Sequence, residues 1–333
     1  MKFITRGVAA LLAAVLITPA AFAEGRIRIA EQFGIVYLLL NVAQDQKLIE
    51  KQGKAQGIDI QVEFVRLSGG GAVNDALLSG HIDIGGAGVG PLLTLWDRTL
   101  GKQNVRGVAS LGNFPYYLVT NNPAVKSIAD FTDKDRIATP AVGVSVQSRV
   151  LQLASAKLWG DAQWNRLDKL QVALPHPEAA AAIIKGGTEV TAHFANPPFQ
   201  EQELAANPNA RIVLKSYDVL GGPASATVLY ATEKFRAENP KTYNAFVAAL
   251  DDAAKFIAAN PEAAADIFGR VGQGNIDRKL VLSIIKSPEV QFKLAPQNTL
   301  ALAQFMHRIG AIKNKPAAAK DYFFDDPHNA GGS

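Results

Sequence analysis

The fold is decided by the stretch Leu67–Pro91, which reads LSGGGAVNDALLSGHIDIGGAGVGP. Just before it, apolar and polar residues alternate from Ile58 to Phe64, and this period of two is typical of a half-buried strand. The loop Ser68–Gly71 follows that strand, and residues 72–79 suit a short helix that ends at Gly80. The chain therefore passes from a strand through a glycine loop into a helix.

The second half of this stretch repeats the arrangement. Residues 82–84 predict a second strand, residues 85–90 a second glycine loop, and Pro91 the start of the next helix, where its missing N–H costs little. Each loop thus leads to a helix N-terminus, whose free N–H groups attract anions. The alternative is that the glycines only allow tight turns. A nucleotide site is disfavoured, because no Gly-Lys-Ser/Thr is present and Pro91 replaces the third glycine of a dinucleotide fingerprint.

The N-terminus has the pattern of a secretory signal peptide. Lys2 and Arg6 give it a basic start, an apolar run extends from Val8 to Ile17, and Ala21-Phe22-Ala23 fits an A-x-A cleavage site. The apolar run is too short to span a bilayer. We therefore expect cleavage after Ala23, and removing 23 residues from 333 leaves a mature chain of 310. No cysteine follows the cleavage site, which disfavours a lipid anchor.

Charge and composition exclude several classes of function. The formal net charge of +4 falls to +2 once Lys2 and Arg6 are removed, which is too small to indicate binding to nucleic acid or to a membrane surface. The chain has no cysteine, so thiolate catalysis, disulfide exchange and cysteine-based metal sites are excluded. The fold must instead rest on its apolar core, and 310 residues are enough to bury one or two cores.

Strands and helices alternate in two successive sets, and the two sets share a sequence echo. Ala76–Ile84 resembles Ala182–Val190 at an offset of 106, with a small residue, two aliphatic residues, glycine, and then an acidic and an aliphatic residue in register. The alternative explanation is chance, combined with the ordinary succession of helix, glycine and strand. As a repeat, the echo predicts two similar α/β lobes with mostly parallel sheets covered on both faces. The loops after their strands would then face each other across a cleft.

Several segments of the mature chain resemble the nitrate/sulfonate/taurine-type solute-binding proteins of ABC importers. They are LLSGHIDIGGAGVGPLL (77–93), SIADFTDKDRIATPAVGVSVQSRVL (127–151), AAAIIKGGTEVTAHFANPPF (180–199) and ATEKFRAENPKTYNAFVAAL (231–250). The resemblance implies a two-lobed α/β fold, the type II periplasmic-binding-protein fold, in which each lobe is a mostly parallel sheet flanked by helices. It also implies crossings between the lobes near Tyr116–Thr120 and Leu220–Thr227. Lobe 1 is then expected at 24–117 and 226–333, and lobe 2 at 118–225.

The same resemblance implies a receptor rather than an enzyme. Proteins of this kind bind a small molecule in the periplasm and deliver it to the transmembrane subunits of an ABC importer, usually as monomers. The alternative is an enzyme on the same scaffold, similar to pyrimidine-precursor synthases or small lyases. The signal peptide favours the receptor, because those enzymes work in the cytoplasm. We therefore expect a periplasmic monomer with no cofactor, no metal and no nucleic-acid partner.

The ligand site that the resemblance implies lies on loops at the strand ends. The residues expected to form it are Phe33, Gly34, Tyr37, Ser68, Gly69, Gly70, Gly71, Ala87, Gly88, Val89, Asn113, Val144, Ser145, Gln147, Ser148, His193 and Asn196. Relatives commonly carry Trp-x-Pro or an acidic residue where this chain has residues 193–197, so the ligand itself is not implied. His193 is left open between a ligand contact and a structural histidine, and Ser145 is predicted to cap a helix. No His-Glu-x-x-His pair or Gly-x-Ser-x-Gly elbow is present, so no catalytic or metal-binding residue is predicted.

The charge of the predicted loops indicates the kind of ligand. Asp, Glu, Lys and Arg are absent from loops 33–37, 68–71, 85–90, 144–148 and 193–197. A buried ammonium would lack a carboxylate partner there, and a second anionic group would lack an arginine or lysine. We therefore predict a monoanionic organic ligand such as an alkyl or aryl sulfonate, with a neutral pyrimidine-like ring as the alternative. Taurine is disfavoured by its ammonium group, although Glu31, Glu178 or Asp218 would overturn this by reaching inward.

Overall fold

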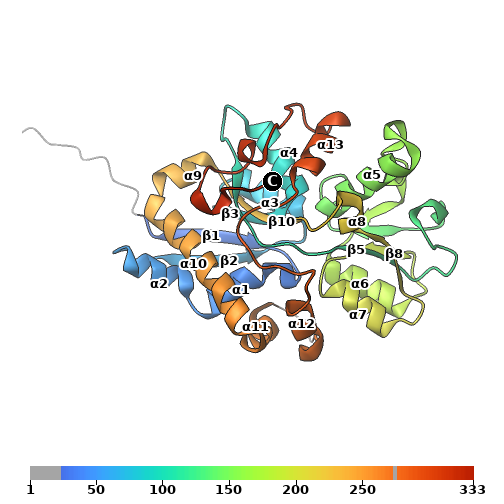
Figure 1. Cartoon of the computed structure of the whole chain (residues 1–333), viewed down its shortest axis with the longest axis horizontal. Coiled ribbons are helices and arrows are strands. Elements are labelled where there is room, and N and C mark those ends of the chain that lie inside the picture. Colours follow the sequence, from blue (N-terminus) through green and yellow to red (C-terminus); the bar gives the residue numbers. More distant parts are fainter. Residues whose placement is uncertain (1–23, 273–275) are drawn as a thin grey trace, which may run out of the picture.

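The computed structural model describes residues 24–272 and 276–333, which form two α/β lobes side by side (Figure 1). Each lobe contains a five-stranded sheet flanked by helices, so the predicted two-lobed α/β fold is confirmed. The predicted signal peptide, residues 1–23, lies outside the described residues. Within the two described ranges, no helix combines the length and the apolar character that crossing a bilayer requires.

The first sheet has the strand order β2-β1-β3-β10-β4. Its strands are β1 (Arg26–Glu31), β2 (Gln61–Arg66), β3 (Ile84–Gly88), β4 (Arg106–Ser110) and β10 (Thr227–Ala231). β1 pairs in parallel with β2 and β3, whereas β10 runs antiparallel to β3 and β4. The helices before and after these strands are α1 (Leu38–Asp45), α2 (Leu48–Ala55), α3 (Gly70–Leu78), α4 (Val89–Thr99), α9 (Glu233–Glu238), α10 (Pro240–Ala259), α11 (Pro261–Ile267), α12 (Arg278–Ile285) and α13 (Leu300–Arg308). The β-branched and aromatic residues of β10 are all buried, as a central strand requires.

The second sheet has the strand order β7-β6-β8-β5-β9. Its strands are β5 (Tyr117–Thr120), β6 (Ile137–Thr139), β7 (Gln171–Ala173), β8 (Ala192–Phe194) and β9 (Arg211–Lys215). Here β6 pairs in parallel with β7 and β8, and β5 runs antiparallel to β8 and β9. Its helices are α5 (Val146–Trp159), α6 (His176–Lys185), α7 (Phe199–Ala206) and α8 (Ser216–Leu220). Short 3-10 or π turns along the chain are η1 (Ile35–Tyr37), η2 (Ile128–Asp130), η3 (Asp161–Gln163), η4 (Asp168–Leu170), η5 (Phe268–Gly272), η6 (Ala319–Asp321) and η7 (Pro327–Asn329).

The two sheets share one topology, which gives the sequence echo a structural basis. In each sheet a central strand, β3 or β8, lies between a parallel neighbour and an antiparallel strand that follows a crossing between the lobes. The helices before these strands, α3 and α6, begin 106 residues apart at Gly70 and His176. The second sheet includes the chain from Tyr117, and the first sheet takes it back at Thr227. The predicted lobe boundaries themselves stay a prediction.

The predicted glycine loop at residues 85–90 is wrong. Its first residues complete β3, and α4 begins directly after them. None of these glycines adopts the left-handed backbone that a tight turn would need. They are required for close packing instead, because a Cβ on Gly85 would lie 2.7 Å from the ring of Tyr230, and one on Gly86 would lie 2.4 Å from the carbonyl oxygen of Ala30.

Buried polar side chains hold the hinge together where the chain crosses between the lobes. The hydroxyl groups of Tyr116 and Thr227 lie 2.5 Å apart and join the two crossings. The Ser225 hydroxyl donates to Asn113 Oδ1 at 3.0 Å, and the Asn113 amide donates to Gln297 at 2.8 Å. Asn113 is fully buried in this network, so its side chain joins the two crossings instead of lining the cavity. The C-terminal segment that carries Gln297 therefore packs on both crossings.

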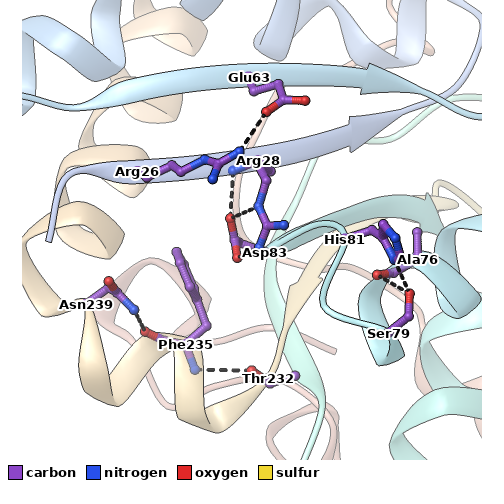
Figure 2. Close-up of polar contacts among 10 residues, drawn as sticks. All are labelled: Arg26, Arg28, Glu63, Ala76, Ser79, His81, Asp83, Thr232, Phe235 and Asn239. Carbon is purple, nitrogen blue, oxygen red and sulfur yellow. Dashed lines mark hydrogen bonds and ion pairs between the residues drawn. The ribbon is translucent and has the colours of Figure 1, made fainter. Parts of the chain in front are cut away.

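An ion pair at the other end of β3 fixes where that strand begins. The Arg28 guanidinium of β1 donates to both carboxylate oxygens of Asp83 at 3.0 and 2.7 Å, and the Arg28 backbone N–H donates to the same carboxylate at 2.8 Å (Figure 2). A second pair, Arg26 with Glu63, is more exposed and lies between β1 and β2 (Figure 2). Asp83, the acidic residue of the echo, therefore anchors β3 beside β1.

The packing role of Gly86 predicts that Gly86→Ala destabilises the protein. The new Cβ meets the backbone of Ala30, which cannot move aside as a flexible side chain can, so we expect a loss of about 2 kcal/mol in the free energy of unfolding. Gly71→Ala is the matched control, because a Cβ there has no described neighbour within 4 Å. Urea denaturation measures both variants, and equal unfolding free energies would contradict the packing role.

Candidate functional site

A partly open cavity lies between the two lobes, where the carboxyl ends of the parallel strands of both sheets meet. Its volume is about 20 Å³. The residues that line it are Gln32, Phe33, Tyr37, Gly70, Gly88, Pro91, Tyr116, Pro140, Ser145, Val146, Gln147, His176, Asn196 and Thr227. A cavity of this size holds little more than one water molecule, so a larger ligand requires the lobes to move apart.

The side of the cavity on the first sheet is built on β1 and β3. Gln32 directly follows β1, and its side-chain amide donates to the carbonyl oxygen of Gly86 at 3.2 Å. The hydroxyl of Tyr37 donates to the same oxygen at 3.2 Å. Gly70 is the first residue of α3, so the unpaired N–H groups of that helix start beside the cavity.

The opposite side of the cavity is built on the N-termini of α5 and α6. Ser145 caps α5 as predicted, because its hydroxyl accepts a hydrogen bond from the N–H of Ser148 at 3.2 Å. Gln147 lies in the first turn of α5, and His176 is the first residue of α6. Gln147 Nε2 lies 3.1 Å from His176 Nε2. The starts of α3, α5 and α6 together give the cavity a positive potential.

The cavity lining carries no Asp, Glu, Lys or Arg from the described part of the chain, which agrees with the prediction of an uncharged site. Glu178 and Asp218 are exposed and do not reach inward. Glu31 is buried, but its carboxylate accepts hydrogen bonds from Asn41 at 3.2 Å and from Arg66. Burial raises the pKa of Glu31, and the charge of Arg66 opposes that rise. Within residues 24–272 and 276–333, no group of histidine and acidic side chains is arranged to hold a metal ion.

A chain of buried polar side chains extends from the cavity into the second lobe. His176 Nδ1 lies 2.7 Å from His193 Nε2, and His193 Nδ1 lies 2.5 Å from Glu203 Oε1. None of the three side chains is more than 3% exposed. Burial lowers the pKa of both histidines, that of His193 to about 3, and raises the pKa of Glu203. The interior therefore favours the neutral form of all three groups.

The lobes touch through hydrogen bonds to backbone atoms beside the cavity. The N–H of Ile35 donates to the carbonyl oxygen of Pro197 at 3.0 Å, and the Asn196 amide donates to the carbonyl oxygen of Phe33 at 3.1 Å. Both bonds join the loop after β1 to the loop after β8. The contacts between the lobes therefore include the loops that line the cavity.

Two glycines allow the close approach of the lobes. A Cβ on Gly69 would lie 2.5 Å from the carbonyl oxygen of Pro140, and one on Gly90 would lie 2.7 Å from the carbonyl oxygen of Val144. Contacts this short with backbone atoms are not tolerated by any larger residue. The glycines before α3 and at the start of α4 thus serve the meeting of the lobes. Gly70, in contrast, meets the side chain of Pro91 within its own lobe, at 2.3 Å.

The structure separates the predicted ligand residues into three groups. Those that line the cavity are Phe33, Tyr37, Gly70, Gly88, Ser145, Gln147 and Asn196. Those at the contact between the lobes or beneath the α5 cap are Gly34, Gly69, Val144 and Ser148. Those outside the lining are Ser68, Gly71, Ala87, Val89, Asn113 and His193. His193 lies behind His176, which stands between it and the cavity.

Part of the lining is not among the residues predicted from the sequence. The additional residues are Gln32, Pro91, Tyr116, Pro140, Val146, His176 and Thr227. The sequence echo could have indicated His176. Its offset of 106 residues makes His176 the counterpart of Gly70, which is a predicted ligand residue. Tyr116 and Thr227 lie on the predicted crossings, which pass the cavity.

An apolar groove of about 280 Å³ opens next to the cavity, and Phe33 lines both. The other residues of the groove are Gly34, Pro177, Ala180, Ala181, Ile184, Phe199, Gln202, Gly272 and Ile276. They come from both lobes, and none of these described residues is charged. The groove therefore continues the polar cavity outward as an apolar surface.

The family of this chain follows from its sequence. A sequence profile described as the NMT1-like family matches residues 36–272, more than half of the chain. The protein belongs to the NMT1-like family. No curated protein sequence matches this NMT1-like protein significantly.

Solved structures of periplasmic proteins have folds similar to that of this NMT1-like protein. The alkanesulfonate-binding protein SsuA from Xanthomonas axonopodis pv. citri, bound to MOPS, has a TM-score of 0.69 at 18% identity over 90% of this chain and 98% of its own. The nitrate-binding protein NrtA from Synechocystis PCC 6803 has a TM-score of 0.68 at 15% identity, over 90% and 84%. The aliphatic sulphonate-binding protein SsuA from Escherichia coli has a TM-score of 0.64 at 17% identity, over 92% and 99%. The fold is therefore that of periplasmic binding proteins.

The contact at Gly69 predicts that Gly69→Ala holds the lobes apart. The new Cβ meets the Pro140 carbonyl of the opposite lobe, and a small rotation at the hinge relieves that contact without unfolding either lobe. We expect a larger radius of gyration in small-angle X-ray scattering and an unchanged unfolding transition. Gly71→Ala is the control, because its Cβ points into open space among the described residues. A radius equal to that of the wild type would contradict this role of Gly69.

Proposed function

We propose that this NMT1-like protein is a periplasmic receptor that binds a small organic monoanion and delivers it to an ABC importer. The observation that carries the proposal is the uncharged cavity lined by both lobes, beside the N-termini of α3, α5 and α6. Because the lining comes from both lobes, a ligand held there contacts both of them. The likeness of the fold to SsuA and NrtA supports a receptor, although fold alone does not determine function.

The polar groups of the cavity suit a single negative charge. The amides of Gln147 and Asn196 provide hydrogen-bond donors. The hydroxyl of Tyr37 already donates to the carbonyl oxygen of Gly86, and that of Tyr116 bonds to Thr227, so these two tyrosines add polar but uncharged surface. Burial raises the pKa of both tyrosines, so they stay protonated at neutral pH. An ammonium group would find no carboxylate partner here, and an isolated buried cation is costly. A monoanion is therefore preferred to a zwitterion such as taurine or to a dianion.

The apolar groove accounts for the organic part of the ligand. With its anionic head in the cavity, a ligand that passes Phe33 reaches the groove walls formed by α6, α7 and η5. Each buried methylene group contributes about 0.8 kcal/mol, so affinity should rise along a series of alkyl chains. This combination favours an alkyl or aryl sulfonate over nitrate, which has no apolar part.

A binding test also distinguishes two alternatives, a neutral ring ligand and an enzyme on the same scaffold. Phe33, Tyr37 and Tyr116 are aromatic residues of the cavity lining and would also suit a neutral, flat, pyrimidine-like ring. An enzyme on the same scaffold would convert its ligand, whereas a receptor releases it unchanged. Chromatography of the ligand after incubation separates the receptor from the enzyme.

The ligand class predicts an order of affinities in isothermal titration calorimetry. We expect butanesulfonate to bind more tightly than methanesulfonate, and taurine to bind more weakly than ethanesulfonate, which has the same chain without the ammonium group. Tighter binding of taurine would contradict the uncharged site. Binding of uracil without binding of any sulfonate would instead support the neutral ring.

A charge placed in the cavity predicts a loss of anion binding. Gln147→Glu keeps the shape of the side chain but adds a carboxylate beside His176, so we expect affinity for butanesulfonate to fall about tenfold or more. Glu178→Gln is the matched control, because Glu178 is exposed in the first turn of α6 and does not line the cavity. Calorimetry measures both variants, and equal affinities would place the anion elsewhere.

A further inference from the structure

The buried chain His176–His193–Glu203 connects the ligand cavity to a carboxyl group that does not line it. A neutral imidazole has one N–H group and one acceptor nitrogen, so each ring passes on the direction of the hydrogen bond that it receives. The direction of all the hydrogen bonds in this series therefore depends on Glu203, the group at its inner end. We propose that Glu203 sets whether His176 presents a hydrogen-bond donor or an acceptor to the ligand cavity.

The first arrangement has a protonated Glu203. Its carboxyl O–H donates to His193 Nδ1, and His193 then donates from Nε2 to His176 Nδ1. His176 must carry its own proton on Nε2. The Gln147 amide nitrogen lies 3.1 Å from that atom and cannot accept a hydrogen bond, so the Gln147 side chain has to turn away in this arrangement. A ligand in the cavity then meets an N–H donor.

The second arrangement has an ionised Glu203, whose proton has passed to solvent. His193 now donates from Nδ1 to the carboxylate, and His176 donates from Nδ1 to His193 Nε2. His176 Nε2 is left as an acceptor, which the amide Nε2 of Gln147 reaches at 3.1 Å. The two arrangements differ by one proton, and both imidazoles are neutral in each.

The surroundings of Glu203 keep its protonated form accessible. Its second oxygen, Oε2, is buried and has no hydrogen-bond partner among the described residues, so the charged form is poorly solvated. Glu201, also on α7, has its pKa raised to about 7 by burial and further by the nearby Glu203. Burial likewise raises the pKa of Glu203.

Among the described residues, His193 is the only titratable group that shifts the pKa of His176. α5 contributes the amide of Gln147, α7 stacks the ring of Phe199 on the imidazole at 5.7 Å, and the cavity contributes the protonated phenols of Tyr37 and Tyr116. Burial lowers the pKa of His176, and the neighbouring His193 lowers it further. The imidazole therefore responds to Glu203 by exchanging its protonated nitrogen rather than by becoming charged.

This inference deepens the proposed function, and its consequence for binding rests on that function. An anion requires the donor arrangement, so it binds to the form with a protonated Glu203. Above the pH at which Glu203 titrates in the free protein, anion binding should take up about one proton, and affinity should fall about tenfold for each further pH unit. Below that pH, binding should take up no proton.

Nuclear magnetic resonance of the free protein tests the proton arrangement without any ligand. Imidazole nitrogens that carry a proton and those that accept a bond have distinct ¹⁵N shifts, and His176→Asn assigns the signals of His176. We expect Nε2 of His176 to carry the proton at low pH and Nδ1 to carry it at high pH, with the exchange at the pH where Glu203 titrates. In Glu203→Gln the arrangement should be the same at every pH, whereas the neighbouring control Glu201→Gln should retain the exchange.

A His176 arrangement that does not change with pH in the wild type would overturn the proposal. An exchange that persists in Glu203→Gln would overturn it as well. Calorimetry with butanesulfonate in two buffers of different ionisation enthalpy then measures proton uptake, which should be about one in the wild type and near zero in Glu203→Gln above the transition. If no anion binds while the nuclear magnetic resonance result holds, the proposed function fails and the proton switch stands.

Discussion

The two lobes approach each other closely at positions that have no side chain. Gly69 and Gly90 bring backbone within contact distance of Pro140 and Val144 in the other lobe. With larger residues there the lobes could not meet, and the cavity between them would stay open to water. Enclosure is also what makes the dipoles around the cavity effective, because their interaction with a charge is much stronger away from bulk solvent. The proposed recognition of a ligand thus depends on this close approach.

The polar cavity combines fixed dipoles with the absence of a fixed charge among its described lining residues. The starts of α3, α5 and α6 supply N–H groups, and Ser145 and Gln147 supply side-chain donors or acceptors. Such a site holds one negative charge without the desolvation cost of a buried arginine or lysine. In such a site, His193 and Glu203 set whether His176 presents a hydrogen-bond donor or an acceptor. Selectivity can therefore depend on proton arrangement as well as on shape.

The fold was predictable in outline because its signals are local and periodic. Alternation near β2, the glycines before α3 and the Ser145 cap each reflect interactions between residues close in sequence. The prediction of a loop at Gly85 and Gly86 is wrong because these glycines are needed where Tyr230 and Ala30 pack closely against β3. Sequence spacing does not reveal such contacts. The partners of His193 are hidden for the same reason, since α6 and α7 contribute them separately. The predicted loops carry no charged residue by composition, and the described lining of the cavity contains none from elsewhere.

The most direct test of this account is a crystal structure of the mature protein grown with butanesulfonate. The account predicts a sulfonate between the starts of α3 and α5, with oxygen atoms in hydrogen-bond contact with groups from both lobes and the alkyl chain directed past Phe33 into the apolar groove. A sulfonate bound only at the outer surface, or held by side chains of one lobe alone, would contradict it.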